Sequence, residues 1–321
     1  MTIESFRAAP DILSFGKAPG PPVGALEDIK CPVADGSEII LRIYYPHSFQ
    51  KGQLELLPCY MNYHGGGWVI GAIDDDETFL RKVCVQCNCV IVDVNYRIAP
   101  EHKYPIPVTD SCEAFSYLVT QAARLGIDKT RIAVGGFSAG GHIAAVVCQM
   151  ARDGKLQVTE KPCFQLLVIP VCDASGLDTD LQVKKDCPHK SWTEHHDGPF
   201  LSHSRMSWFY YYFLPSPIPP SLLLEPRLSP LLATSLADLP PALVVPAEVD
   251  VLRDEGIAYA RRLAKESGSW TELWLAKGVP HPFPCQTEAT DISKQFQELA
   301  ILRLSEVFEG KLKEGEFISN V

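Results

Sequence analysis

The chain contains 321 residues, of which 46% are hydrophobic and 21% are charged, with 29 Lys and Arg against 39 Asp and Glu. This globular composition excludes disordered and collagen-like proteins, and a net charge of −10 without a basic run argues against nucleic-acid binding through phosphates. A chain of this length can bury a large core without disulfides or metals, and α/β chains of this size often form one domain with an inserted cap.

Short β-branched runs alternate with helical segments along most of the chain. The sequence predicts strands at 39–45, 57–63, 90–96, 131–135, 164–171, 242–247 and 271–275, and helices at 74–86, 109–125, 139–152, 252–265 and 292–312. Several of these strands, such as the run at Val90, are apolar on both faces. This pattern predicts an α/β fold with an open, mostly parallel sheet covered by helices on both faces.

Two regions interrupt this alternation. Residues 1–35 are rich in proline, and residues 173–239 lack a clean strand but contain a dense run of aromatic residues between 192 and 213. Long insertions between core strands are usually functional. We therefore expect one domain, 1–321, with a cap formed by about 1–35 and about 175–235. The alternative is an irregular surface excursion that buries its aromatics in itself.

The N-terminal sequence and the cysteine content indicate the cellular compartment in which the protein is expected. The first 20 residues lack the apolar core of a signal peptide, and no run of 18 apolar residues predicts a membrane span. The eleven cysteines are odd in number and scattered, so we expect free thiols in a reducing cytoplasm. Cys84, Cys87 and Cys89 lack further ligands at metal-site spacing and are expected to be buried structural thiols. The three aspartates at 74–76 are expected to form a solvated helix N-terminus.

The strongest motif is Gly136-Phe137-Ser138-Ala139-Gly140, which joins the predicted strand 131–135 to the predicted helix 139–152. A tight strand-to-helix turn strains the serine backbone, requires small neighbours and exposes the hydroxyl at the helix N-terminus. The motif therefore predicts Ser138 as a nucleophile. Its alternative is a glycine-rich turn without chemistry.

A second glycine-rich segment, His64-Gly65-Gly66-Gly67-Trp68, follows the predicted strand 57–63. Without side chains, Gly65, Gly66 and Gly67 let backbone N–H groups approach a developing oxyanion, where such donors typically contribute ~3 kcal/mol. The amide of Ala139 would add another donor. This segment alone could be a structural turn, but two such motifs in this order, each after a core strand, are far less expected by chance.

A serine nucleophile needs a histidine base, and this architecture orders them as serine, acid, histidine. Of the nine histidines, those before Ser138 fail this order and four lie in the predicted cap. His142 is one helical turn past Ser138 and is expected to pack on that helix. His281 remains, in a loop after the strand 271–275, where a catalytic base belongs in an open α/β sheet.

The acid is expected just past the carboxyl end of the strand 242–247. Asp250 occupies that place, whereas Asp254 and Glu255 are competitors at helix N-terminal positions, where carboxylates have an ordinary dipole-stabilising role. Strand-end placement suits an orienting carboxylate, so Asp250 is favoured. The predicted catalytic residues are Ser138, Asp250 and His281.

These motifs, together with Tyr96-Arg97-Ile98-Ala99-Pro100-Glu101-His102, resemble the hormone-sensitive-lipase-like group of α/β-hydrolase esterases. The match runs from about Asp35 to Phe308. It implies an eight-stranded sheet, a cap built from the N-terminus and the insertion before the acid, and hydrolysis of a small-molecule carboxylic ester without cofactor or metal. It also implies an oxyanion hole of Gly66, Gly67 and Ala139, a brace around Tyr96-Arg97, and a possible homodimer through the last strand and helix.

Three positions depart from the family pattern. Phe137 stands where the family commonly has an acidic residue, Val251 where it often has proline, and Pro282 where it often has glycine. None removes a catalytic group, so a divergent member with its own substrate is expected.

The leading prediction is a serine esterase that works through an acyl-enzyme. The runner-up is an acyltransferase, lyase or cyclase of the same fold that acts on a polyketide-like substrate, which an aromatic-rich cap would suit. A binding protein without chemistry is the third class, and the intact site argues against it.

Overall fold

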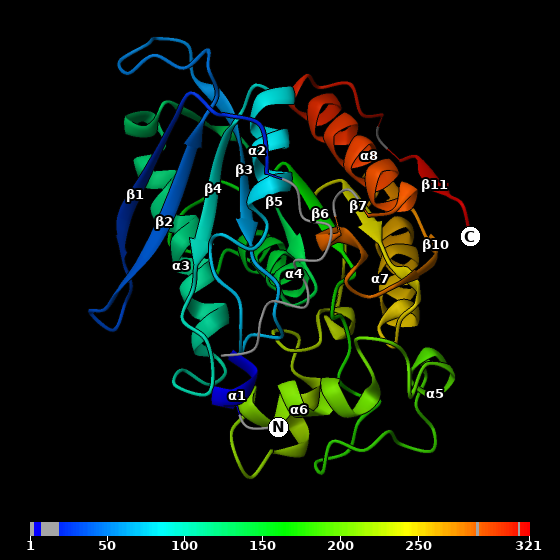
Figure 1. Cartoon of the computed structure of the whole chain (residues 1–321). Helices are drawn as coiled ribbons and strands as arrows, with labels where there is room; N and C mark the ends of the chain where they lie inside the picture. Colours follow the sequence, from blue (N-terminus) through cyan, green and yellow to red (C-terminus); the bar gives the residue numbers. More distant parts are fainter. Residues whose placement is uncertain (1–2, 8–18, 287–288, 314) are drawn as a thin grey trace.

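The computed structural model describes residues 3–7, 19–286, 289–313 and 315–321 (Figure 1). Over these residues, nine strands form one sheet in the order β1-β2-β4-β3-β5-β6-β7-β9-β11. The β1–β2 and β2–β4 pairs are antiparallel, and the remaining pairs are parallel. The prediction of an open, mostly parallel α/β sheet is confirmed.

The strands of this sheet are β1 (Ala25–Pro32), β2 (Glu38–Tyr45), β3 (Leu57–Tyr63), β4 (Val90–Asn95), β5 (Ile127–Phe137), β6 (Phe164–Val168), β7 (Ala242–Val245), β9 (Thr271–Leu273) and β11 (Phe317–Ser319). All residues of β3 and β6 are buried, because helices cover both faces of the sheet there. A separate parallel pair joins β8 (Ala247–Val249) to β10 (Ala276–Pro280). β8 follows β7 in the chain after Pro246, and Asp250 and His281 come directly after β8 and β10.

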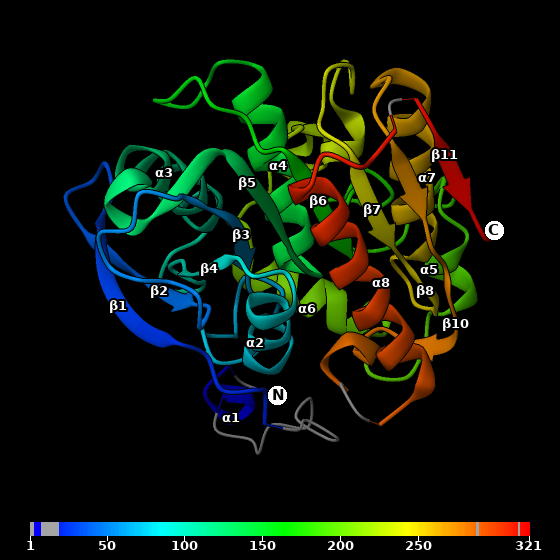
Figure 2. The ribbon, with the colours of Figure 1, turned by 90° about the horizontal axis from the view of Figure 1, so that it is seen from above.

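Five longer helices cover the two faces of the sheet: α2 (Glu77–Gln86), α3 (Ile106–Gln121), α4 (Ala139–Arg152), α7 (Arg253–Glu266) and α8 (Asp291–Phe308). Figure 2 shows α2 and α8 on one side and α3, α4 and α7 on the other. The buried side chains accordingly form two clusters, one on each face. Short 3-10 turns lie at Ala123–Leu125, Pro220–Leu224, Pro230–Leu232 and Phe283–Cys285.

Two strands differ from expectation. Ala25–Pro32, expected as part of the cap, form β1 at the edge of the sheet. Most of its side chains are exposed, so the segment lacks the apolar pattern by which a strand is recognised. At the opposite edge, the three-residue β11 adds to β9, so the described sheet has nine strands rather than the eight implied by the resemblance.

The segments outside the sheet gather at one end of it. Figure 1 shows α1 (Ile3–Arg7), α5 (Ser191–Glu194) and α6 (His203–Phe213) together beyond the carboxyl ends of the parallel strands. Arg7 fixes α1 there, donating to the Val69 and Ala99 carbonyls and pairing with Glu101. Residues 173–239, called the insertion below, contain α5 and α6.

The aromatic side chains of the insertion pack against the rest of the chain. Trp68 of the glycine loop stacks on Phe213, with ring centroids 4.2 Å apart, and contacts Tyr210 at 5.6 Å. Tyr210 and Phe213 are fully buried, while Tyr211 of the same helix is exposed. The aromatic run therefore does not bury its side chains only within itself.

The eleven cysteines all lie within the described residues, and none of them forms a disulfide bond. In the part of the chain that the structure describes, no helix is both long and apolar enough to cross a membrane.

Candidate active site

Ser138 stands in the turn between β5 and α4, with φ 56° and ψ −114°. Its amide donates to the Val168 carbonyl over 2.8 Å, which ties the turn to the neighbouring strand β6. A Cβ atom on Gly136 or Gly140 would lie 2.2 or 1.8 Å from the Tyr63 carbonyl oxygen. The glycines flanking the serine are thus required by close backbone approach, as the motif predicted.

Three side chains from distant parts of the sequence meet at this turn. His281 Nε2 lies 3.0 Å from Ser138 Oγ, and His281 Nδ1 lies 2.7 Å from Asp250 Oδ2. Asp250 follows β8 and His281 follows β10, so the β8–β10 pair brings the two residues together. The predicted residues Ser138, Asp250 and His281 are therefore adjacent in space.

The geometry sets the direction of proton transfer. A carboxylate at Nδ1 keeps the imidazole proton on that nitrogen, which leaves Nε2 free to accept the Ser138 hydroxyl proton. Asp250 is 1% exposed and also accepts the Leu252 amide over 3.1 Å, so its carboxylate is held in place. The arrangement can activate a hydroxyl nucleophile.

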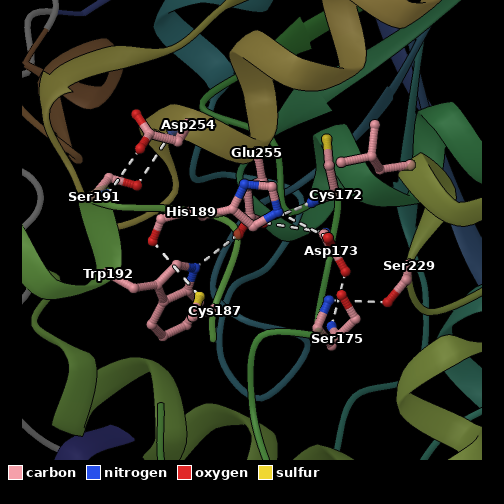
Figure 3. A network of polar contacts seen from close by, with 12 residues as sticks. Cys172, Asp173, Ser175, Cys187, His189, Ser191, Trp192, Ser229, Asp254 and Glu255 are labelled. Atoms are coloured by element: carbon pink, nitrogen blue, oxygen red, sulfur yellow. Dashed lines mark hydrogen bonds and ion pairs between the residues drawn. The ribbon is translucent and has the colours of Figure 1, made fainter. Parts of the chain in front are cut away.

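The two competing acids lie elsewhere. Asp254 accepts the Ser191 amide over 2.9 Å and pairs with Arg253. Glu255 accepts N–H groups from Cys172, over 2.8 Å, and from Trp192 (Figure 3). Neither contacts His281, which matches the preference for Asp250.

The glycine loop follows β3 and adopts conformations that other residues rarely take. Gly66 has φ 101° and Gly67 has φ 58°. A Cβ on Gly66 would lie 2.3 Å from the Ile70 carbonyl oxygen, and one on Gly67 would lie 2.4 Å from the Phe209 ring. Within the described residues, the amides of Gly66 and Gly67 donate to no other backbone carbonyl. These amides are thus available to a bound group.

Two aromatic contacts hold the glycine loop. Tyr96 donates its hydroxyl proton to the His64 carbonyl over 2.7 Å and stacks on the His64 ring at 4.1 Å. Trp68 donates from Nε1 to Nδ1 of His142 over 3.2 Å. His142 Nε2 in turn donates to the Arg227 carbonyl, within the insertion, over 3.1 Å. His142 therefore joins α4, the glycine loop and the insertion, a role that its helical spacing alone did not indicate.

Burial lowers the pKa of His142 from its ordinary value of 6.5 to about 4. A base whose pKa is lowered in the folded state stabilises the fold above pH 6.5, and this stability is lost as the pH falls toward 4. We expect up to about 3 kcal/mol of unfolding free energy to depend on this residue across that window. In His142→Gln, urea unfolding at pH 4–7.5 should show a correspondingly flatter pH dependence. Equal slopes in the two proteins would contradict this assignment.

Phe209 lies next to the site, although the sequence did not single it out from the aromatic run around it. It lies on α6, is 7% exposed, and its ring stands against Gly67. The aromatic run around it was visible in the sequence, but which ring faces the glycine loop depends on how α6 is placed. The contact follows from tertiary structure alone.

The structure shows where the three residues that depart from the family pattern are placed. Phe137 packs against Phe79 and Phe296, with ring centroids 5.5 and 5.9 Å away, on the face of the sheet covered by α2 and α8. Val251 is fully buried, and Pro282 precedes the 3-10 turn Phe283–Cys285. None of them displaces Ser138, Asp250 or His281.

Other clusters in the sequence contribute nothing to this site. Cys84 and Cys89 are buried as expected, and their thiols donate to the Tyr44 and Val83 carbonyls, whereas Cys87 is only partly buried. Over the described ranges, no three His, Cys, Asp or Glu side chains are grouped so as to hold a metal ion.

A family described as alpha/beta hydrolase fold matches residues 60–285. The chain is 36% identical over 272 residues to an arylesterase from Saccharolobus solfataricus, which covers 83% of this chain and 79% of that protein. It is 33% identical over 272 residues to ethyl acetate hydrolase from Pseudomonas putida, covering 84% and 79% of the two chains.

A solved structure shows the same similarity. An ester-hydrolase from the metagenome of Lake Arreo, complexed with a derivative of bipyridine phosphonate, superposes with a TM-score of 0.84. The two sequences are 34% identical, and the superposition covers 96% of this chain and 91% of that chain.

Proposed function

We propose that Ser138, Asp250 and His281 are the catalytic triad of this chain, which belongs to the alpha/beta hydrolase fold family, in its hormone-sensitive-lipase-like esterase group, and hydrolyses carboxylic esters. The observation that carries this proposal is the continuous hydrogen-bond chain from Ser138 Oγ through His281 to Asp250. Such a chain is what a hydroxyl needs in order to become a nucleophile.

In the proposed reaction, Ser138 Oγ attacks the ester carbonyl while His281 Nε2 takes the hydroxyl proton. The tetrahedral oxyanion accepts hydrogen bonds from the amides of the Gly65-Gly66-Gly67 loop and of Ala139. His281 then returns the proton to the leaving alcohol, and an acyl-enzyme remains. Water, deprotonated by His281, releases the acid. Asp250 keeps the imidazole oriented and stabilises its protonated form.

We further propose that α1 and the insertion form a cap over this site. Support comes from the contacts of Trp68 with Phe213 and of Gly67 with Phe209, which join the glycine loop to α6. An ester bound at Ser138 would then lie between the glycine loop and α6. The cap would thereby shape the pocket for the acyl or alcohol group.

The proposed triad is tested with a fluorophosphonate probe and mass spectrometry of the labelled peptides. We expect one adduct, on Ser138, and saturable turnover of p-nitrophenyl esters from acetyl to aryl. Labelling at another residue, or turnover that persists after complete labelling, would overturn the assignment. Alcohol added as a competing acceptor distinguishes hydrolysis from acyl transfer, because an acyltransferase would make the new ester in preference to the acid.

Replacing Phe209 by Ala should change chain-length preference, because the ring stands against Gly67 at the edge of the proposed pocket. We expect the ratio of kcat/KM for octanoyl to acetyl p-nitrophenyl esters to rise about tenfold, since even one methylene of apolar contact in a pocket is worth about 1–3 kcal/mol. Tyr211→Ala is the matched control, since Tyr211 is 64% exposed on the same helix. A ratio that is the same in both variants would show that Phe209 does not limit the pocket.

A further inference from the structure

A second buried carboxyl group lies where the insertion meets α7. Glu255, in the first turn of α7, is fully buried. One of its oxygens accepts the amides of Cys172 and Asp173, over 2.8 and 3.3 Å, where the chain leaves the sheet to enter the insertion. The other accepts the indole N–H of Trp192, on α5, over 3.0 Å (Figure 3). One side chain thus holds the beginning of the insertion and its first helix.

Ser191, on α5, makes two further hydrogen bonds at this joint between the insertion and α7. Its amide donates to Asp254 over 2.9 Å, and its hydroxyl donates to the Val251 carbonyl over 2.7 Å. Val251 is the residue after Asp250, so α5 rests directly on the segment that carries the proposed catalytic acid. Ser191 and Trp192 are both buried, and the joint is therefore part of the interior rather than a surface contact.

We infer that Glu255 is a positioning residue that clamps the cap onto the segment following Asp250, so that its loss loosens the cap and weakens ester binding. The inference rests on the proposed function, since it assigns to Glu255 the placement of the cap over Ser138. Glu255 touches neither Ser138 nor His281, and it acts through Trp192 and the Cys172–Asp173 backbone.

The surroundings of Glu255 make this clamp sensitive to pH. Burial raises the pKa of Glu255 from its ordinary value of 4.5 to about 8, although His189 and the Cys172 amide oppose this shift. His189 pairs with Asp173 over 2.7 Å. The other titratable groups facing the carboxyl are Cys172, just before the insertion, and Cys187 and Tyr210 within it.

The sign of the pH effect follows from linkage. A docked cap keeps Glu255 protonated up to about pH 8, whereas an undocked cap returns the carboxyl to water and to its ordinary pKa of 4.5. The contribution of Glu255 to docking is therefore fully present below pH 4.5 and is lost as the pH rises to about 8. KM for an ester substrate should rise across the same interval.

The test uses the full chain and the variants Glu255→Gln and Trp192→Phe, the second of which removes only the indole donor. Glu255→Gln cannot ionise, so the rise of KM for p-nitrophenyl butyrate between pH 5.5 and 8 should flatten, while kcat changes less than about threefold. Trp192→Phe keeps the carboxyl and loses one hydrogen bond worth about 1 kcal/mol, so its KM at pH 6 should rise about fivefold and the pH dependence should be retained.

Hydrogen exchange measured by mass spectrometry reports on the clamp without relying on activity. In Trp192→Phe, exchange should accelerate in peptides that cover 173–213 and stay unchanged in β3, β4 and β5. Glu272→Gln and Trp270→Phe are matched controls, because Glu272 and Trp270 are also buried but contact Arg303 of α8 instead of the insertion. Both controls should leave KM and the exchange of 173–213 unchanged.

The outcomes separate the two proposals. Unchanged KM and unchanged exchange of 173–213 in both variants would overturn the role of Glu255, even when the probe labels Ser138 normally. Failure of the probe to label Ser138 in the unmodified chain would overturn the proposed function, whatever the exchange shows. If Glu255→Gln does not fold, KM and the hydrogen exchange of 173–213 in Trp192→Phe test the role of Glu255 instead.

Discussion

Replacing Ser138 by Ala is expected to lower kcat for p-nitrophenyl butyrate on the order of 10⁶-fold, the loss seen when a triad nucleophile is removed. The hydroxyl is the only group of Ser138 that reaches His281 Nε2, at 3.0 Å, and alanine keeps the fold of the turn because its Cβ is already accommodated. The measurement is steady-state hydrolysis with burst analysis at high enzyme concentration.

A matched control accompanies this variant. Ser116 lies on α3, buried, with its hydroxyl bonded to the Cys112 carbonyl of its own helix. Ser116→Ala should retain activity within about threefold, because it loses one intrahelical hydrogen bond far from the site. If Ser138→Ala kept more than about 1% of the activity, the acyl-enzyme mechanism proposed for Ser138 would have to be abandoned.

Replacing Asp250 by Asn is expected to lower kcat about 10⁴-fold with little change in KM. An amide at this place donates to His281 Nδ1 instead of accepting from it, so the imidazole proton moves to Nε2. The ring can then no longer accept the Ser138 proton. The pH dependence of kcat, measured from pH 5 to 10, should show activity recovering only at high pH, where the hydroxyl itself begins to ionise.

Asp254→Asn distinguishes the two acids that the sequence left in competition. Asn retains an oxygen that can accept the Ser191 amide, so we expect Asp254→Asn to keep activity within about tenfold. Equal losses in Asp250→Asn and Asp254→Asn would mean that Asp250 does not orient His281 and that its contact in the structure is not used in catalysis.

Strong local patterns predicted the elements that position the site. β3 and α4 have the bounds expected from the sequence, because one is apolar throughout and the other begins directly after the glycine-flanked serine. The strand expected at 242–247 is instead divided at Pro246 into β7 and β8, since proline cannot donate to a ladder. β10 was not predicted at all, although it carries His281 into the site.

Local sequence patterns are sufficient to predict the fold class and the candidate nucleophile, acid and base. Chain order and glycine spacing restrict these roles strongly, since a tight turn admits few residue types and the triad follows a fixed order in this architecture. Two contacts, that of Phe209 with Gly67 and that of Glu255 with the insertion, are seen only in the folded chain. Both contacts connect residues far apart in the chain, through segments without regular periodicity. Their pairing depends on packing, which no local pattern encodes.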